Sequence, residues 1–155
     1  MEEAIKVCIY ARVSTSQQDF THQLTSLRAY AREHHYQVVK EYTEKISGAK
    51  KVAEREALKE LLEDVEKNQV KKILVFECSR LSRRALDFLS IIEKLNEKGV
   101  SVFILQNGLE TLLPDGKVNP IASLVLGIMS QFNSMERDLI RARMKNGYDN
   151  LRAQH

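Results

Sequence analysis

The segment KKILVFE, from Lys71 to Glu77, decides the fold of this 155-residue chain. After its two lysines it is continuously apolar, which is typical of a strand buried on both faces of a parallel sheet. Comparable runs flank it along the chain: IKVCIYAR (Ile5 to Arg12), QVVKEY (Gln37 to Tyr42) and VSVFIL (Val100 to Leu105). Because amphipathic stretches separate these runs, the sequence predicts a three-layer α/β fold, with a mainly parallel sheet of four to five strands flanked by helices.

Three stretches between these strands have helical periodicity. The first helix is expected from about Thr21 to His35, the second around Leu58 to Val65, and the third from about Ala85 to Lys98, where Gly99 ends it. The polar segment at 43–55 shows no periodicity and predicts a mobile surface loop. The segment QNGLETLLPDGKV, residues 106–118, is expected to hold a short edge strand before its PDG turn.

A long helix is predicted at the end of the chain, because Asn119 and Pro120 suit an N-cap and a first turn. If it runs to about Arg152 it extends about 45 to 50 Å, which is longer than a domain of this size is wide. We therefore divide the chain into an α/β region, 1–119, and a helix of the same domain, 120–155, that projects from it. An apolar stripe along this helix predicts self-association, although its first turns can also cover the sheet. The stripe consists of Ile121, Leu124, Val125, Ile128, Phe132, Met135 and Leu139.

Composition limits the function only loosely. With 43% hydrophobic residues, no long apolar run and an acidic start, we expect one compact cytoplasmic domain without a membrane span. Cys8 and Cys78 lack CxxC spacing and clustered histidines, so neither a disulfide framework nor a metal site is expected. The absence of GxxxxGK[ST] and GxGxxG weakens kinase, ATPase and dehydrogenase hypotheses. The net charge of +3 permits a polyanionic partner without requiring one.

Two polar clusters follow the first and third predicted strands. The first contains Tyr10, Arg12, Ser14, Ser16 and Gln23, and the second contains Ser79, Arg80, Ser82, Arg83 and Arg84. Because the carboxyl ends of parallel strands share one edge of the sheet, we expect the two clusters to meet. Arg12 lies inside an apolar strand pattern, where a buried guanidinium needs an anionic partner. Arg80 and Arg83 are three residues apart and would point the same way from a helical turn.

Arginines that converge on a serine suit phosphoryl transfer, because guanidinium groups bind phosphate oxygens and stabilise the charge that develops on them. No carboxylate cluster for Mg²⁺ accompanies these arginines, so we expect no metal and no cofactor. Taken one at a time, the same residues are also explained as a turn serine and solvated arginines.

The first cluster resembles the opening motif of the serine recombinases, the resolvase and invertase family, and the resemblance extends over essentially the whole chain. YARVSTSQQ followed by Gln23 carries it. The resemblance implies that Ser14 is the nucleophile, that Arg12 binds phosphate, and that Gln23 and Tyr10 belong to the site.

Two further motifs extend the resemblance. AERE, residues 53–56, places a family arginine on Arg55, which would be another active-site group. SRLSR, residues 79–83, is similar to the family's DRLxR and implies that Arg80 and Arg83 are catalytic.

The last motif, SMERDLIRARMKNG at 134–147, resembles the family's long helix and places its ER pair on Glu136 and Arg137. The implied partners are double-stranded DNA and other copies of the chain, as a dimer and then a tetramer through residues 120–152. Bases on this helix are expected to contact DNA, although a solvated helix face also explains them. They are Arg141, Arg143 and Lys145.

The resemblance implies site-specific DNA recombination without metal or ATP. Ser14 would attack a DNA phosphorus, form a 5′-phosphoserine linkage and release a free 3′-hydroxyl. Because the covalent intermediate conserves the bond energy, rejoining would need no external energy source.

Two departures from the family pattern stand out. Where the family most often has aspartate before the RLxR arginine, this chain has Ser79, and Glu77 is expected to substitute for it in part. The chain also stops at His155, about where the family's linker begins, so we expect the C-terminal DNA-recognition module to be absent from these residues.

Two alternatives stay open from the sequence. Cys78 and Arg84 have the C-x5-R spacing of cysteine-dependent phosphatases, although their loop lacks the glycines that such phosphate-binding loops use. A recombinase-derived module that associates with DNA but has lost activity is the second alternative.

Overall fold

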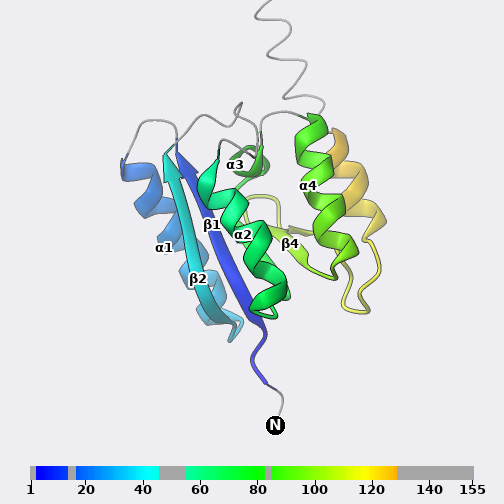
Figure 1. Ribbon diagram of the computed structural model, residues 1–155, viewed down its shortest axis with the longest axis horizontal. Coiled ribbons are helices and arrows are strands. Elements are labelled where there is room, and N and C mark those ends of the chain that lie inside the picture. Colours follow the sequence, from blue (N-terminus) through cyan, green and yellow to red (C-terminus); the bar gives the residue numbers. More distant parts are fainter. Residues whose placement is uncertain (1–2, 14–16, 46–54, 83–84, 129–155) are drawn as a thin grey trace, which may run out of the picture.

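One five-stranded sheet organises the protein (Figure 1). The computed structural model describes residues 3–13, 17–45, 55–82 and 85–128. The strands are β1 (Lys6–Val13), β2 (Gln37–Lys45), β3 (Lys72–Val75), β4 (Ser101–Ile104) and β5 (Leu109–Glu110). Their order is β2-β1-β3-β4-β5; the first four are parallel, and β5 runs antiparallel to β4. The predicted mainly parallel sheet and its short edge strand are confirmed.

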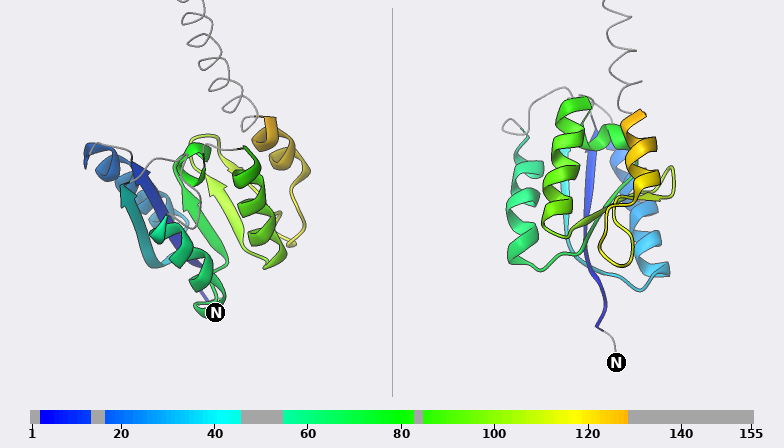
Figure 2. Two further views of the ribbon diagram at one scale, coloured as in Figure 1. Left: turned by 45° about the horizontal axis from the view of Figure 1, so that its top comes forward. Right: turned by 90° about the vertical axis from the view of Figure 1, so that its right-hand side faces the viewer.

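Helices cover both faces of this sheet. They are α1 (Gln17–Glu33), α2 (Glu56–Lys67), the single turn α3 (Cys78–Leu81), α4 (Ala85–Glu97) and a helix at 120–128. Figure 2 shows α2 and α4 on one face and α1 on the other. The predicted three-layer α/β architecture is therefore confirmed.

Two hydrophobic clusters hold the layers together. The larger lies under α2 and α4 and includes Leu58, Leu61 and Phe88, and the smaller lies under α1 and includes Leu27. Because β3 contributes to both clusters, its side chains are buried on either face, which explains its continuous apolar sequence. The sheet is thereby fixed from both sides, and its carboxyl edge becomes a rigid base for functional side chains.

Two element boundaries differ from the prediction. α1 begins at Gln17 rather than near Thr21, because glutamines and an aspartate suit a first helical turn as well as a loop. β2 continues past Tyr42 to Lys45, pairing with the end of β1. β2 is an edge strand with mostly exposed side chains, so its last residues carry no hydrophobic signal.

The C-terminal helix begins as predicted. The Asn119 side-chain oxygen accepts hydrogen bonds from the backbone N–H groups of Ile121 (3.2 Å) and Ala122 (3.4 Å), as an N-cap does. Residues 129–155 lie outside the described residues, so the long projecting helix and the division at 119 stay predictions. No helix within the described ranges is long and apolar enough to cross a membrane.

Candidate active site

Three arginines from distant parts of the sequence converge at the carboxyl edge of the sheet. Arg12 lies near the end of β1, Arg55 is the N-cap residue of α2, and Arg80 lies in α3. Arg12 and Arg55 are almost completely buried, with exposed fractions of 0% and 1%, whereas the Arg80 side chain is 18% exposed. The predicted meeting of the first and second polar clusters is thus confirmed for Arg12 and Arg80.

Arg12 connects β1 to α3 through its guanidinium. Its Nη2 donates to the carbonyl oxygen of Ser79 at 2.8 Å, and its Nε donates to that of Arg80 at 3.2 Å. Arg80 donates back from Nη1 to the carbonyl oxygen of Arg12 at 3.0 Å. The sequence suggested an anionic partner for the buried Arg12 guanidinium. Backbone carbonyl oxygens take part of that role by accepting its hydrogen bonds.

Gln23 holds the backbone of the same strand from the side of α1. It is buried, and its amide nitrogen donates to the carbonyl oxygen of Arg12 at 3.1 Å. That carbonyl, two residues before Ser14, is thus fixed by both Gln23 and Arg80. These bonds fix the backbone at Arg12, near the end of β1.

Arg55 lies in a second hydrogen-bonded network. It donates to the carbonyl oxygens of Leu81 and Arg80, the latter at 2.7 Å, and to the Tyr10 hydroxyl. The Tyr10 hydroxyl in turn donates to Glu44, whose Oε2 lies 3.5 Å from Arg55 Nε. Burial raises the pKa of Tyr10 well above its ordinary value, so this hydroxyl keeps its proton.

Glu44 is the site residue that the sequence did not reveal. Besides Tyr10 and Arg55, its carboxylate accepts from the backbone N–H groups of Ala57 (3.2 Å) and Leu58 (3.3 Å) in the first turn of α2. One carboxylate therefore joins β1, β2 and α2. It pairs in register with Arg12 across the sheet, a signal that is visible only if β2 is extended past Tyr42.

The second cluster is ordered around α3. Glu77 precedes this turn, and its Oε1 accepts from the Ser79 hydroxyl at 2.7 Å and lies 3.1 Å from Arg80 Nε. The expected partnership of Glu77 with Arg80 is therefore present. It arises from i,i+3 spacing at a helix start and not from an extended segment shared by Glu77 and Ser79.

Part of the predicted site cannot be located. The helical turn ends at Leu81 and Ser82 is extended, so the prediction that one helical turn aligns Arg80 with Arg83 is wrong. The positions outside the described residues are Ser14, Arg83, Arg84, Glu136, Arg137, Arg141, Arg143 and Lys145.

The cysteine on which the phosphatase alternative depends is the buried first residue of α3. Cys78 is 3% exposed, and burial raises its pKa to about 11. A thiol with such a pKa is protonated at neutral pH and is a poor nucleophile. The environment of Cys78 thus disfavours the phosphatase alternative.

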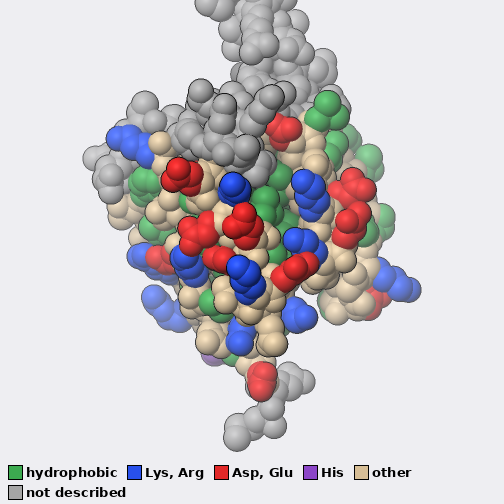
Figure 3. Space-filling model, viewed as in Figure 1, with side chains coloured by type: hydrophobic (Ala, Val, Ile, Leu, Met, Phe, Trp, Pro, Cys, Tyr) green, Lys and Arg blue, Asp and Glu red, His purple; other side chains and the backbone are tan. Residues whose placement is uncertain are grey.

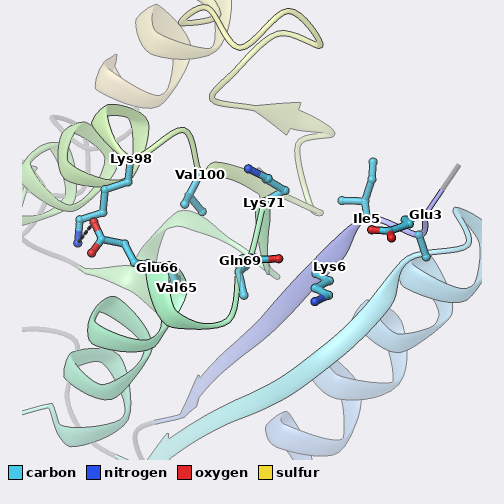
Figure 4. A pocket seen from close by; sticks show the side chains of 11 residues that line it. Glu3, Ile5, Lys6, Val65, Glu66, Gln69, Lys71, Lys98 and Val100 are labelled. Atoms are coloured by element: carbon cyan, nitrogen blue, oxygen red, sulfur yellow. Dashed lines mark ion pairs between the residues drawn. The ribbon is translucent and has the colours of Figure 1, made fainter.

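A pocket of about 520 Å³ lies at the opposite edge of the sheet (Figure 4). Its walls come mainly from the segments that lead into β1, β3 and β4, and Lys98 and Glu66 form an ion pair at 3.7 Å at one end of it. None of the converging arginines lines this pocket. Within the described part of the chain, no group of three or more His, Cys, Asp or Glu side chains is placed to hold a metal ion.

The protein is therefore an α/β protein whose arginines gather at the carboxyl edge of a parallel sheet, the edge at which such sheets bind ligands. Comparisons with known proteins specify the family. The family model described as the resolvase N-terminal domain matches residues 7–155. A resolvase of Clostridium perfringens (strain 13) is 34% identical over 144 residues, which cover 93% of this chain and 70% of the relative. The transposon Tn501 resolvase of Pseudomonas aeruginosa is 33% identical, over 89% of this chain and 66% of the relative.

Solved structures agree with this assignment. The N-terminal catalytic domain of TP901-1 integrase is 33% identical, with a TM-score of 0.68 over 86% of this chain and 98% of that one. A resolvase-family site-specific recombinase from Streptococcus pneumoniae is 28% identical, with a TM-score of 0.61 over 97% of this chain and 99% of that one. The chain therefore belongs to the resolvase family of serine recombinases.

Proposed function

We propose that this chain catalyses strand cleavage and rejoining in site-specific recombination of double-stranded DNA in the cytoplasm, with Ser14 as the nucleophile. The Ser14 oxygen forms a bond to a DNA phosphorus as its hydroxyl proton is lost, the bond from that phosphorus to the 3′-oxygen breaks, and the 3′-oxygen takes up a proton and leaves as a hydroxyl. The reverse reaction, with the 3′-hydroxyl of another strand, restores the phosphodiester and frees the serine.

The observation that carries this proposal is the convergence of Arg12, Arg55 and Arg80 at the carboxyl end of β1, the strand that precedes Ser14 in the sequence. Phosphoryl transfer is catalysed mainly by positioning and by stabilising charge on the phosphorus oxygens. Guanidinium groups meet both needs, since they keep their charge and bind oxygens in a fixed planar geometry.

The three arginines have different roles, which follow from how far each side chain is exposed. Arg12 and Arg55 are buried and donate to backbone carbonyls of Ser79, Arg80 and Leu81, so they fix the position of α3. Arg80 is partly exposed and is the described arginine best placed to meet a DNA phosphate. Arg83 adds a further cation from the residues that follow α3.

Self-association through the helix that begins at residue 120 is the second part of the proposal, as a dimer that becomes a tetramer in the active complex. Ala122 and Leu126 pack into the core, whereas Ile121, Leu124 and Ile128 are exposed. Figure 3 shows hydrophobic surface over α4 and this helix. An apolar stripe on the outside of a helix favours a partner, and the sequence continues it through Phe132, Met135 and Leu139.

Contact with the DNA backbone is assigned to the bases farther along this helix, Arg141, Arg143 and Lys145, with Glu136 and Arg137 as supporting residues. Removing a lysine or arginine that neutralises a phosphate should reduce the slope of log affinity against log salt concentration by about one. Replacing each of these bases with glutamine and measuring affinity against salt concentration tests the assignment.

A covalent capture experiment tests the proposed reaction. The full-length protein is incubated with fragmented DNA of its host, denatured with detergent, and recovered with any DNA that stays attached. The wild-type protein is expected to retain DNA of a defined sequence, and the Ser14→Ala variant to retain none. Equal retention by the two proteins would refute Ser14 as the nucleophile.

A further inference from the structure

The Glu77 carboxylate lies between two neighbours at the start of α3. Its Oε1 accepts a hydrogen bond from the Ser79 hydroxyl at 2.7 Å and lies 3.1 Å from Arg80 Nε. The Glu77 and Arg80 side chains are 27% and 18% exposed, so the pair is half-buried at the edge of the arginine cluster. Ion pairs in such a position are less screened by solvent than pairs on an open surface.

The backbone explains why Glu77 is available for this contact. Glu77 is the N-cap residue of α3, with extended dihedral angles (φ −150°, ψ 162°), yet its side chain makes no capping hydrogen bond. A glutamate at this place would normally interact with the free N–H groups of the first turn. Here the carboxylate is directed to Ser79 and Arg80 instead.

The contact acts on the arginine that is best placed to reach DNA. Arg80 Nε lies against Glu77, and Arg80 Nη1 donates to the Arg12 carbonyl oxygen. Among the described residues, the guanidinium is thus held by one hydrogen bond, to Arg12, and by an ion pair with Glu77 in which Nε makes no aligned hydrogen bond. A cation fixed before the substrate arrives needs no reorganisation when negative charge develops on the phosphate.

We propose that Glu77 is the positioning residue for Arg80 in this chain, and that Ser79 holds the Glu77 carboxylate in place. This inference rests on the proposed function. It also accounts for Ser79, the departure from the family motif, because the acid next to Arg80 comes from position 77. Since the Ser79 hydroxyl lies 2.7 Å from the Glu77 oxygen, a carboxylate built at position 79 would reach the same place.

The test compares variants of the full-length protein by the rate at which they form the covalent adduct with their captured DNA, at saturating DNA. Glu77→Gln keeps the size of the side chain and removes its charge, and it is expected to lower the rate about tenfold to a hundredfold. Ser79→Ala keeps the charge and loosens its position, so the loss is expected to be smaller. Glu66→Gln, in the ion pair at the opposite edge of the sheet, is the matched control and should leave the rate unchanged.

Rescue separates a positioning role from a merely structural one. The double variant Glu77→Gln, Ser79→Asp should recover most of the wild-type rate, and thermal melting should show all variants folded. The inference about Glu77 is overturned if Glu77→Gln forms the adduct at the wild-type rate, or if the double variant recovers none of the lost rate. Adduct formation by Ser14→Ala would instead overturn the proposed function, so the two failures are distinguishable.

Discussion

The side chains of Arg12 and Arg80 each donate a hydrogen bond to the backbone carbonyl of the other residue. The Arg12 Nε to Arg80 oxygen distance is 3.2 Å, and the Arg80 Nη1 to Arg12 oxygen distance is 3.0 Å. This reciprocal contact joins the strand that leads into the nucleophile to the turn that carries the partly exposed Arg80. Arg12 and Arg80 therefore supply positive charge to the site and also hold the end of β1 against α3.

The reciprocal contact predicts that Arg12 stabilises the fold as well as the site. Arg12→Met should lower the free energy of unfolding by about 1 to 3 kcal/mol, because the Ser79 carbonyl loses the Arg12 donor while the Arg80 carbonyl keeps the donor from Arg55. Denaturation with urea measures this change. Arg28→Met is the matched control, since Arg28 forms an exposed ion pair with Glu41 and its loss should have little effect. Equal stability of the two variants would contradict the prediction.

Glu44 is predicted to be needed for both stability and cleavage. Glu44→Gln leaves the buried Arg55 charge without its anionic neighbour, and should lower the free energy of unfolding by about 3 kcal/mol. Glu41→Gln, on the same strand but on its exposed side, is the control. The same urea midpoint for both variants would show that the hydrogen-bonded network around Arg55 does not stabilise the fold.

Both cysteines are predicted to be unreactive thiols at neutral pH. Burial raises the pKa of Cys8 and of Cys78 to about 11, from an ordinary value of 9.0. Between these values the unfolded chain loses protons that the folded chain keeps, so the folded state should lose stability as pH rises from about 9 to about 11. Iodoacetamide at about pH 8 should therefore label the cysteines only after unfolding. Rapid labelling of the native protein, or loss of cleavage in Cys78→Ala, would contradict the prediction.

The helix of residues 120–128 predicts opposite outcomes for two leucines. Leu124 is 66% exposed and Leu126 is 2% exposed. Leu124→Glu should leave the domain folded and weaken its self-association, whereas Leu126→Glu should unfold it, because a charge would enter the core. Sedimentation analysis with circular dichroism distinguishes these results. Unchanged self-association in Leu124→Glu would exclude this face as the interface.

The sequence predicts the sheet and the convergence of the polar clusters because both follow from patterns along single segments. The segment at 71–77 predicts the buried strand. The rule that parallel strands end at one edge of the sheet predicts that Arg12 and Arg80 meet. Glu44 was missed because the end of an exposed edge strand has no hydrophobic pattern. The hydrogen bonds of Arg12 and Arg55 to α3 were also beyond prediction, since they depend on a single helical turn formed in the tertiary structure.

The bond between the residue 14 hydroxyl and DNA can be verified by locating the atom through which the protein is attached. The captured adduct is digested with nuclease and protease, and the peptide that contains residue 14 is analysed by mass spectrometry. A nucleotide attached to Ser14 through its 5′-phosphate, with a free 3′-hydroxyl on the other DNA end, is the predicted result. A nucleotide attached to Cys78, Tyr10 or any other residue would contradict the account.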